Sequence, residues 1–110
     1  MEYTLTLEDL IEWLENQDKD IVIKNGFGGE AHSDRSSLQD ISFDPKKYTT
    51  IGEMLKSAKS ALGKKVEGYK GGYFTINGLS KVFIGEWCNF GESITYKKLS
   101  EWLLCETQCK

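Results

Sequence analysis

The side chains best suited to chemistry lie in residues 25–37, which read Asn-Gly-Phe-Gly-Gly-Glu-Ala-His-Ser-Asp-Arg-Ser-Ser. This stretch contains three glycines, three serines, the one histidine of the chain, His32, and its one arginine, Arg35. Glycines bring the backbone close to a ligand, and amides, hydroxyls, imidazole and guanidinium groups bind phosphate oxygens. The composition predicts an anion-binding loop, and the alternative is an ordinary solvated connection of the same residue types.

The elements that position this loop begin with a helix. Thr6 and Asp9 have the spacing of a capping box, and apolar residues then recur at helical spacing. This pattern predicts a helix over residues 7–16, followed by a polar turn. Ile21, Val22 and Ile23 form a β-branched run that is typical of a short buried strand. We expect this strand to lead directly into the loop.

Beyond the loop, weak alternation over residues 38–43 predicts a second short strand, which Pro45 closes. Thr50 and Glu53 then have the spacing of a capping box before an apolar stripe that ends at Gly63. The sequence therefore predicts a second helix over residues 51–62. We interpret the lysines on its outer face and end as solvated charges that complement the helix dipole.

A second glycine-rich segment, residues 68–73, precedes two short apolar runs at 74–76 and 82–84. The turn dipeptide at 77–78, Asn-Gly, predicts that these runs pair as a β-hairpin. Thr95 then caps a last helix, on which Tyr96, Leu99, Trp102 and Leu103 share a face. The predicted order is α-β-β-α-β-β-α, an α+β fold in which a small, mainly antiparallel sheet packs against two or three helices.

Length and charge narrow the classes of protein. A chain of 110 residues fits a single domain, residues 1–110, with one modest core. The formal charge is −3 and no long run of lysines is present, which argues against nucleic-acid polymers as partners. The sequence contains neither an apolar run of membrane-spanning length nor the pattern of a signal peptide. We therefore expect a cytoplasmic protein without a membrane partner.

Cysteine spacing argues against disulfides and metal sites. The three cysteines, Cys88, Cys105 and Cys109, are an odd number without close pairing, which indicates reduced thiols. Structural zinc needs four protein ligands and catalytic zinc at least three, and the sequence offers no such set. We expect neither a metal nor a cofactor.

Several motifs together resemble a group of small phage-encoded proteins. These are Gly-Phe-Gly followed by His-Ser-x-Arg, then Phe-Asp-Pro at 43–45, Thr-x-Gly-Glu-Met-Leu at 50–55 and Gly-Tyr-Lys-Gly-Gly at 68–72. The similarity covers residues 23 to about 95. The chain departs from the group by one extra residue before His32 and by Ser36 in place of glycine.

The resemblance implies an anti-defence protein that binds a nucleotide immune signal in the host cytoplasm and does not cleave it. Arg35 then pairs bidentately with a phosphate, and a homo-oligomer encloses the ligand. His32 donates a hydrogen bond or stacks on a base, and the 68–73 segment forms the other wall. The predicted ligand-binding residues are Phe27, Gly28, Gly29, His32, Ser33, Arg35, Tyr69, Lys70 and Tyr73.

Two alternatives belong to other classes. A phosphodiesterase could use His32 as general acid or base and Arg35 for the developing charge, but the chain has no second histidine and no carboxylate cluster for metals. A small inhibitor could instead bind a host defence enzyme through a strand edge, its acidic surface or exposed aromatics such as Trp87. His32 and Arg35 would then only hold the loop in place.

Overall fold

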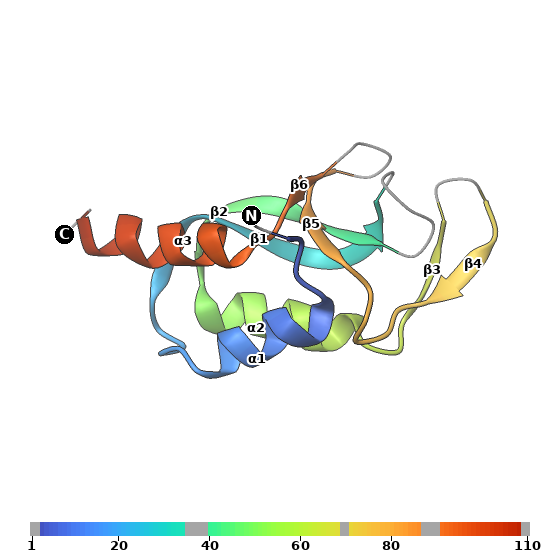
Figure 1. Ribbon diagram of the computed structural model, residues 1–110, viewed down its shortest axis with the longest axis horizontal. Coiled ribbons are helices and arrows are strands. Elements are labelled where there is room, and N and C mark those ends of the chain that lie inside the picture. Colours follow the sequence, from blue (N-terminus) through green and yellow to red (C-terminus); the bar gives the residue numbers. More distant parts are fainter. Residues whose placement is uncertain (1–2, 35–39, 69–70, 87–90, 109–110) are drawn as a thin grey trace.

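The protein has an α+β fold, in which helices pack against a mixed, mostly antiparallel sheet (Figure 1). The computed structural model describes residues 3–34, 40–68, 71–86 and 91–108, with side chains up to residue 103. The helices are α1 (Leu7–Glu15), α2 (Ile51–Ala61) and α3 (Tyr96–Gln108). The strands are β1 (Val22–Ser33), β2 (Ile41–Thr50), β3 (Lys65–Glu67), β4 (Tyr73–Thr75), β5 (Val82–Ile84) and β6 (Glu92–Ser93).

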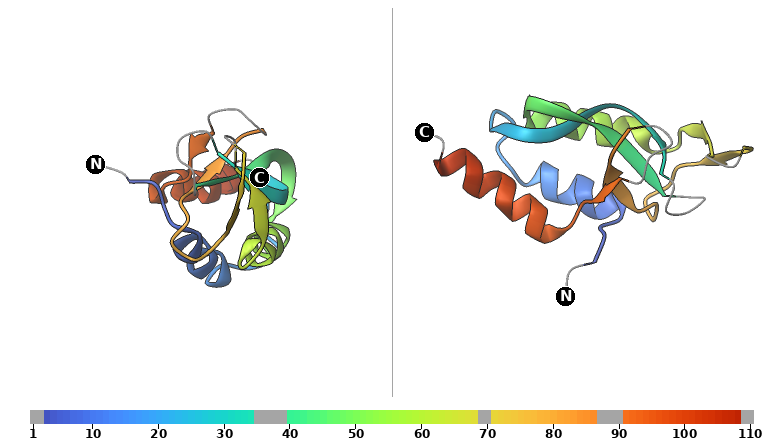
Figure 2. Two further views of the ribbon diagram at one scale, coloured as in Figure 1. Left: turned by 90° about the vertical axis from the view of Figure 1, so that its right-hand side faces the viewer. Right: turned by 90° about the horizontal axis from the view of Figure 1, so that it is seen from above.

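The main sheet has the strand order β1-β2-β5-β6, and β3 and β4 form a separate two-stranded sheet. The pairs β1 with β2 and β5 with β6 are antiparallel, whereas β2 and β5 are parallel. Helices α1 and α2 lie beneath the sheet, α3 lies along one side of the β1–β2 hairpin, and the β3–β4 hairpin projects at one end (Figures 1 and 2).

The three predicted helices are confirmed, and local capping explains where each begins. In α1 the Thr6 hydroxyl accepts a hydrogen bond from the backbone of Asp9, whose carboxylate accepts from the backbone of Thr6. The Thr50 hydroxyl caps α2 by accepting a hydrogen bond from the backbone N–H of Glu53. The Thr95 hydroxyl caps α3 by accepting one from the backbone N–H of Lys98. Gly63 follows α2 with φ +79°, as expected for a glycine beyond a helix end.

The core lies between the sheet and the helices. The ring centroid of Phe27 lies 4.6 Å from that of Phe43 and 6.1 Å from that of Trp102. Trp102 also meets Trp13 of α1 at 6.4 Å, so rings from α1, α3 and the β1–β2 hairpin pack together. Tyr96, which was predicted to share a face of α3 with Leu99 and Trp102, is 40% exposed, and its ring packs edge-on against Tyr3 rather than in the core.

The prediction of a loop over 25–37 is wrong for its first part. Residues 22–33 form one long strand that pairs with β2 as far as Ser33, opposite Ile41. A Cβ atom added at Gly26 would lie 2.7 Å from Thr49 Cγ2 and 2.8 Å from Met54 Sδ. The glycine at this position therefore serves close packing of the strand against its neighbours rather than a loop conformation.

Pro45 does not close the second strand, which was predicted over 38–43. β2 continues to Thr50, and Pro45 pairs with Phe27 inside it. On its other side β2 pairs with β5 only at residues 41–43. Proline has no N–H to donate, and it fits here because β5 does not extend along this part of the strand.

The predicted hairpin of 74–76 with 82–84 is also wrong. β4 pairs antiparallel with β3, whereas β5 pairs with β2 and β6. Asn77 does form a turn, since the N–H of Leu79 donates to its side chain. The chain crosses to the main sheet after that turn because Val82 and Phe83 are buried there, whereas Tyr73 remains exposed on β4.

Candidate functional site: a lysine groove beside the glycine-rich strand

A groove runs beside the first half of β1, where the glycine-rich sequence begins. It consists of two hollows of about 200 and 180 Å³, both of which touch Asn25 and Lys98. The first lies between β1 and α3, and the second lies between the β1–β2 hairpin and the ends of β5 and β6. We call this joint feature the lysine groove, because its lining includes Lys24, Lys46, Lys47 and Lys98.

The lysine groove carries more positive than negative charge. Its four lysines face two acidic residues, Glu92 and Glu101. The ammonium of Lys98 lies 2.5 Å from Glu92, and that of Lys46 lies 3.5 Å from Glu53. Within the described part of the chain, Lys24 and Lys47 are exposed and make no ion pair. A protein of net charge −3 therefore presents, at one groove, two ammonium groups that pair with no carboxylate among the described residues.

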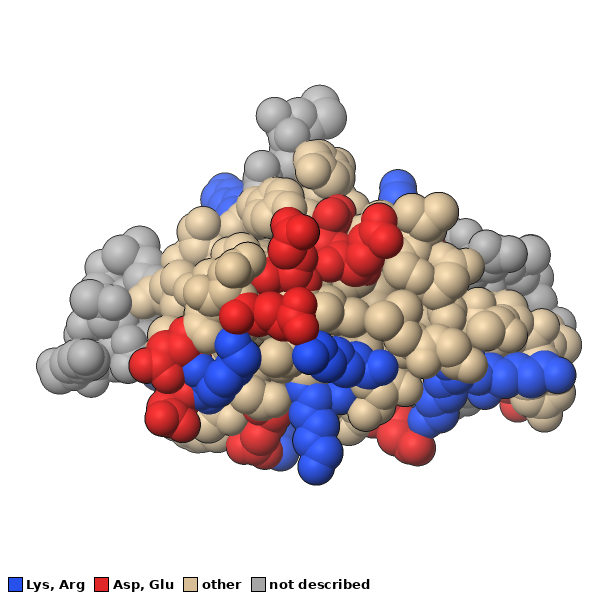
Figure 3. All heavy atoms as spheres, turned by 90° about the horizontal axis from the view of Figure 1, so that it is seen from below, with Lys and Arg blue, Asp and Glu red and all other residues tan. Residues whose placement is uncertain are grey.

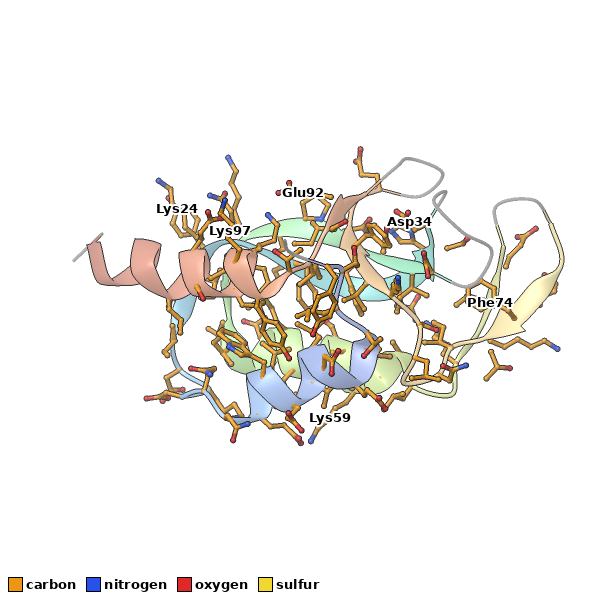
Figure 4. All side chains as sticks on the ribbon, in the orientation of Figure 1. Lys24, Asp34, Lys59, Phe74, Glu92 and Lys97 are labelled. Carbon is orange, nitrogen blue, oxygen red and sulfur yellow. The ribbon has the colours of Figure 1, made fainter. Side chains whose placement is uncertain are left out.

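Figure 4 shows Lys24 and Lys97 pointing to the same upper side of the molecule, on which Glu92 also lies. The opposite face, formed by α1 and α2, shows acidic and basic side chains next to one another (Figure 3). On that face the Lys59 ammonium lies 2.8 Å from Glu15. That face therefore carries side chains of both charge signs.

Apolar side chains contribute to the floor of both hollows of the groove. Ile23 and Trp102 line the first hollow, and both are nearly fully buried. Pro45 and Ile84 line the second. An apolar floor with ammonium groups and one amide side chain, that of Asn25, is the combination that accommodates a base or ribose while its phosphate meets the lysines.

The predicted binding residues of β1 separate into different environments. Phe27 is fully buried in the core, where a ligand does not reach it. A Cβ atom at Gly28 would lie 2.8 Å from Cδ of Lys46, so this glycine makes room for a lysine of the groove. Gly29 has φ +79° and stands where the register between β1 and β2 shifts, at a β-bulge.

His32 and Ser33 lie at the end of β1 and are engaged by the protein itself. His32 Nε2 is 3.1 Å from Asp44 Oδ1, and its Nδ1 is 3.3 Å from the backbone oxygen of Ser33. Ser33 is buried, with its hydroxyl 3.4 Å from the backbone oxygen of Asp34. The contact between His32 and Asp44 ties the end of this strand to β2.

The neighbouring Asp34, which the sequence did not single out, is fully buried. Its Oδ1 accepts hydrogen bonds from the hydroxyl of Ser42 at 2.6 Å and from the backbone N–H of Gly91 at 2.8 Å. Figure 4 shows Asp34 at the end of the sheet opposite Lys24. A buried carboxylate with two donors joins β1, β2 and the segment before β6.

Tyr73 lies on the projecting β3–β4 hairpin, 68% exposed, with the Lys65 ammonium 5.8 Å from its ring centroid. Arg35, Tyr69 and Lys70 lie outside the described residues. The structure therefore brings Gly28 next to the lysine groove and holds His32 and Ser33 at the strand end. Tyr73 stands on a separate hairpin.

The groove lysines were missed by sequence reasoning because they come from distant positions, with Lys24 on β1, Lys47 on β2 and Lys98 on α3. The sequence has three lysine dipeptides, at 46–47, 64–65 and 97–98, and nothing local distinguishes the two that contribute to the groove. Among the described residues no group of three or more His, Cys, Asp and Glu side chains is placed to hold a metal ion. Nor does any helix in this part of the chain have the length and apolarity needed to cross a membrane.

The fold and groove define a small α+β protein with a cationic surface groove. Comparison of the chain with protein-family models, with curated proteins and with solved structures finds no match.

Proposed function

We propose that the protein binds a nucleotide in the lysine groove and sequesters it without cleaving it. The observation that carries this proposal is a pair of ammonium groups, Lys24 and Lys47, that form no ion pair with any described residue and line a groove with apolar side chains. The ammonium groups hold the phosphates, and Asn25 offers both a donor and an acceptor to a base or ribose.

The functional groups present favour binding over hydrolysis. Ammonium groups hold their protons at neutral pH and donate hydrogen bonds without acting as bases. The one histidine, His32, is already engaged at both ring nitrogens by Ser33 and Asp44. A phosphodiesterase that used His32 as general acid or base would need one of these nitrogens available to the reacting group.

The resemblance to small phage-encoded proteins extends this proposal to its biological role. The ligand is then a nucleotide signal of a host defence system, and the protein acts in the host cytoplasm. The groove is open at the surface, and a second copy of the chain that covers it would enclose the ligand, so we also propose a homo-oligomer.

A second candidate function is inhibition of a host enzyme by direct protein contact. It is supported by large exposed side chains that the fold leaves uncovered, including Tyr48 at 67% and Leu79 at 71% exposure. This alternative does not require the lysine groove to hold a small ligand.

The test is a thermal-shift and calorimetric screen of the full chain against cyclic oligonucleotides and ADP-ribose isomers. A ligand at a hundred times its dissociation constant adds about 2.7 kcal/mol to the free energy of unfolding, which raises the Tm by several degrees. Lys24→Glu and Lys47→Glu should each abolish the shift, whereas Lys81→Glu, an exposed lysine outside the groove, should retain it.

The ligand recovered after denaturation should be chemically unchanged. Turnover of the ligand would support the phosphodiesterase instead. If no nucleotide shifts the Tm and a host protein is retained by both the wild type and Lys47→Glu, direct inhibition is the better account.

A further inference from the structure

A second hollow, separate from the lysine groove, lies between the β-bulge of β1 and the outer side of α2. Its volume is about 250 Å³, and it shares no lining residue with the groove. Small residues make it concave: Gly29 and Ala31 come from β1, and Ser57, Ser60 and Ala61 come from α2. Their side chains have at most two heavy atoms, so the surface between strand and helix is not filled.

Two lysines stand at this hollow. Lys56 is exposed and forms no ion pair with any described residue, whereas the Lys64 ammonium lies 2.7 Å from Glu30. The hydrogen bond and the charge of Lys64 lower the pKa of the Glu30 carboxyl. Glu30 is 86% exposed, so it can turn into solvent and release Lys64.

We propose that this hollow binds the phosphate group of a small phosphate monoester between Lys56 and Lys64. The hydroxyls of Ser57 and Ser60 provide additional donors. Gly29, at φ +79°, lies in the β-bulge that forms the strand side of the hollow. The Glu30 carboxylate competes with the phosphate, because it already forms an ion pair with one of the two lysines, Lys64.

The ligand class follows from size and charge. A hollow of about 250 Å³ has room for a phosphate group with a few further atoms. Two ammonium groups match the two negative charges of a monoester above its second pKa of about 6. A sulfate ester of the same shape carries one charge and should bind less tightly.

The experiment follows amide resonances of the full chain by nuclear magnetic resonance during titration with methyl phosphate, and with methyl sulfate as the matched monoanion. We expect saturable shifts at Gly29, Ser57 and Ser60 with methyl phosphate, and binding that tightens between pH 5.5 and 7.5. Methyl sulfate should bind more weakly and without this pH dependence.

Lys56→Gln should raise the Kd for methyl phosphate about fivefold, the effect of one exposed charge contact. Glu30→Gln should lower it about threefold because Lys64 is released. Lys59→Gln, on the same helix but paired with Glu15 away from the hollow, should leave it unchanged.

The proposal is overturned if these amides do not shift, if the shifts appear only at Asn25 and Lys98, or if Glu30→Gln weakens binding. It is independent of the lysine groove. Loss of nucleotide binding in Lys47→Glu would leave the methyl phosphate titration of this hollow intact.

Discussion

The carboxylate of Asp34 accepts a 2.8 Å hydrogen bond from the backbone N–H of Gly91, 57 residues further along the chain. The contact ties the end of β1 to the segment that leads into β6. It also explains the glycine, since a Cβ atom at position 91 would lie 2.7 Å from both Asp34 Oδ1 and Phe83 Cβ. One tertiary contact therefore constrains the residue type at both position 34 and position 91.

Gly91→Ala should therefore destabilise the protein by about 1–3 kcal/mol, the usual cost of overpacking. Asp34→Ala should cost a similar amount or more, because it leaves the Ser42 hydroxyl and the Gly91 N–H without their acceptor. Urea denaturation measures both changes. An unchanged urea-denaturation midpoint for Gly91→Ala would contradict this prediction, because it would show that the segment before β6 can shift without loss of stability.

Thr49 offers the opposite case, a substitution that should stabilise the protein. Its side chain is fully buried, and its hydroxyl has no hydrogen-bond partner within the described part of the chain. Thr49→Val removes the buried hydroxyl and keeps the shape, so we expect a gain of about 1 kcal/mol. Thr49→Ser, which keeps the hydroxyl and removes the methyl, is the control and should lower the Tm.

Tyr48 is strained by its backbone. It has φ 56°, which is unfavourable for a bulky side chain, and its ring is 67% exposed and packs little. Tyr48→Asn should be neutral or stabilising by up to about 1 kcal/mol, because asparagine tolerates this region. Tyr73→Asn, at equal exposure on a strand without positive φ, should instead be slightly destabilising.

Ligand binding in the lysine groove should depend on salt. Lys24 and Lys47 are exposed, so their attraction for phosphate is screened as ionic strength rises. The double variant Lys24→Gln/Lys47→Gln should bind about tenfold or more weakly at low salt and should show a flatter salt dependence. Calorimetry at three salt concentrations tests this, and an unchanged slope would place the ligand elsewhere.

The ion pair of Glu30 with Lys64 predicts a small acid dependence of stability. Lys64 lowers the pKa of the Glu30 carboxyl below its ordinary value of 4.5, so the folded state favours the ionised form. The stabilisation is complete above pH 4.5 and is lost as the pH falls through the lowered value. The Tm difference between wild type and Glu30→Gln should therefore shrink below pH 4.5. It is small throughout, because Glu30 is 86% exposed.

The sequence by itself determined the helices and the fold class. Thr6, Thr50 and Thr95 each cap a helix, and Gly63 follows the end of α2, because capping depends on residues within one turn of each other. The apolar stripe of α1 likewise predicted which face of this helix is buried. These signals are local, so the chain order of the helices was predictable.

Only the tertiary structure decided how the strands pair and where the charged groups gather. The glycines at 26 and 28 indicated a loop, but Met54 of α2 and the side chains of β2 require small residues there, which no local pattern shows. β4 joined β3 rather than β5 because the burial of Val82 in the main sheet outweighed a favourable turn at Asn77. The lysine groove is likewise a product of β1, β2 and α3 meeting, since pairing between distant segments depends on the whole core.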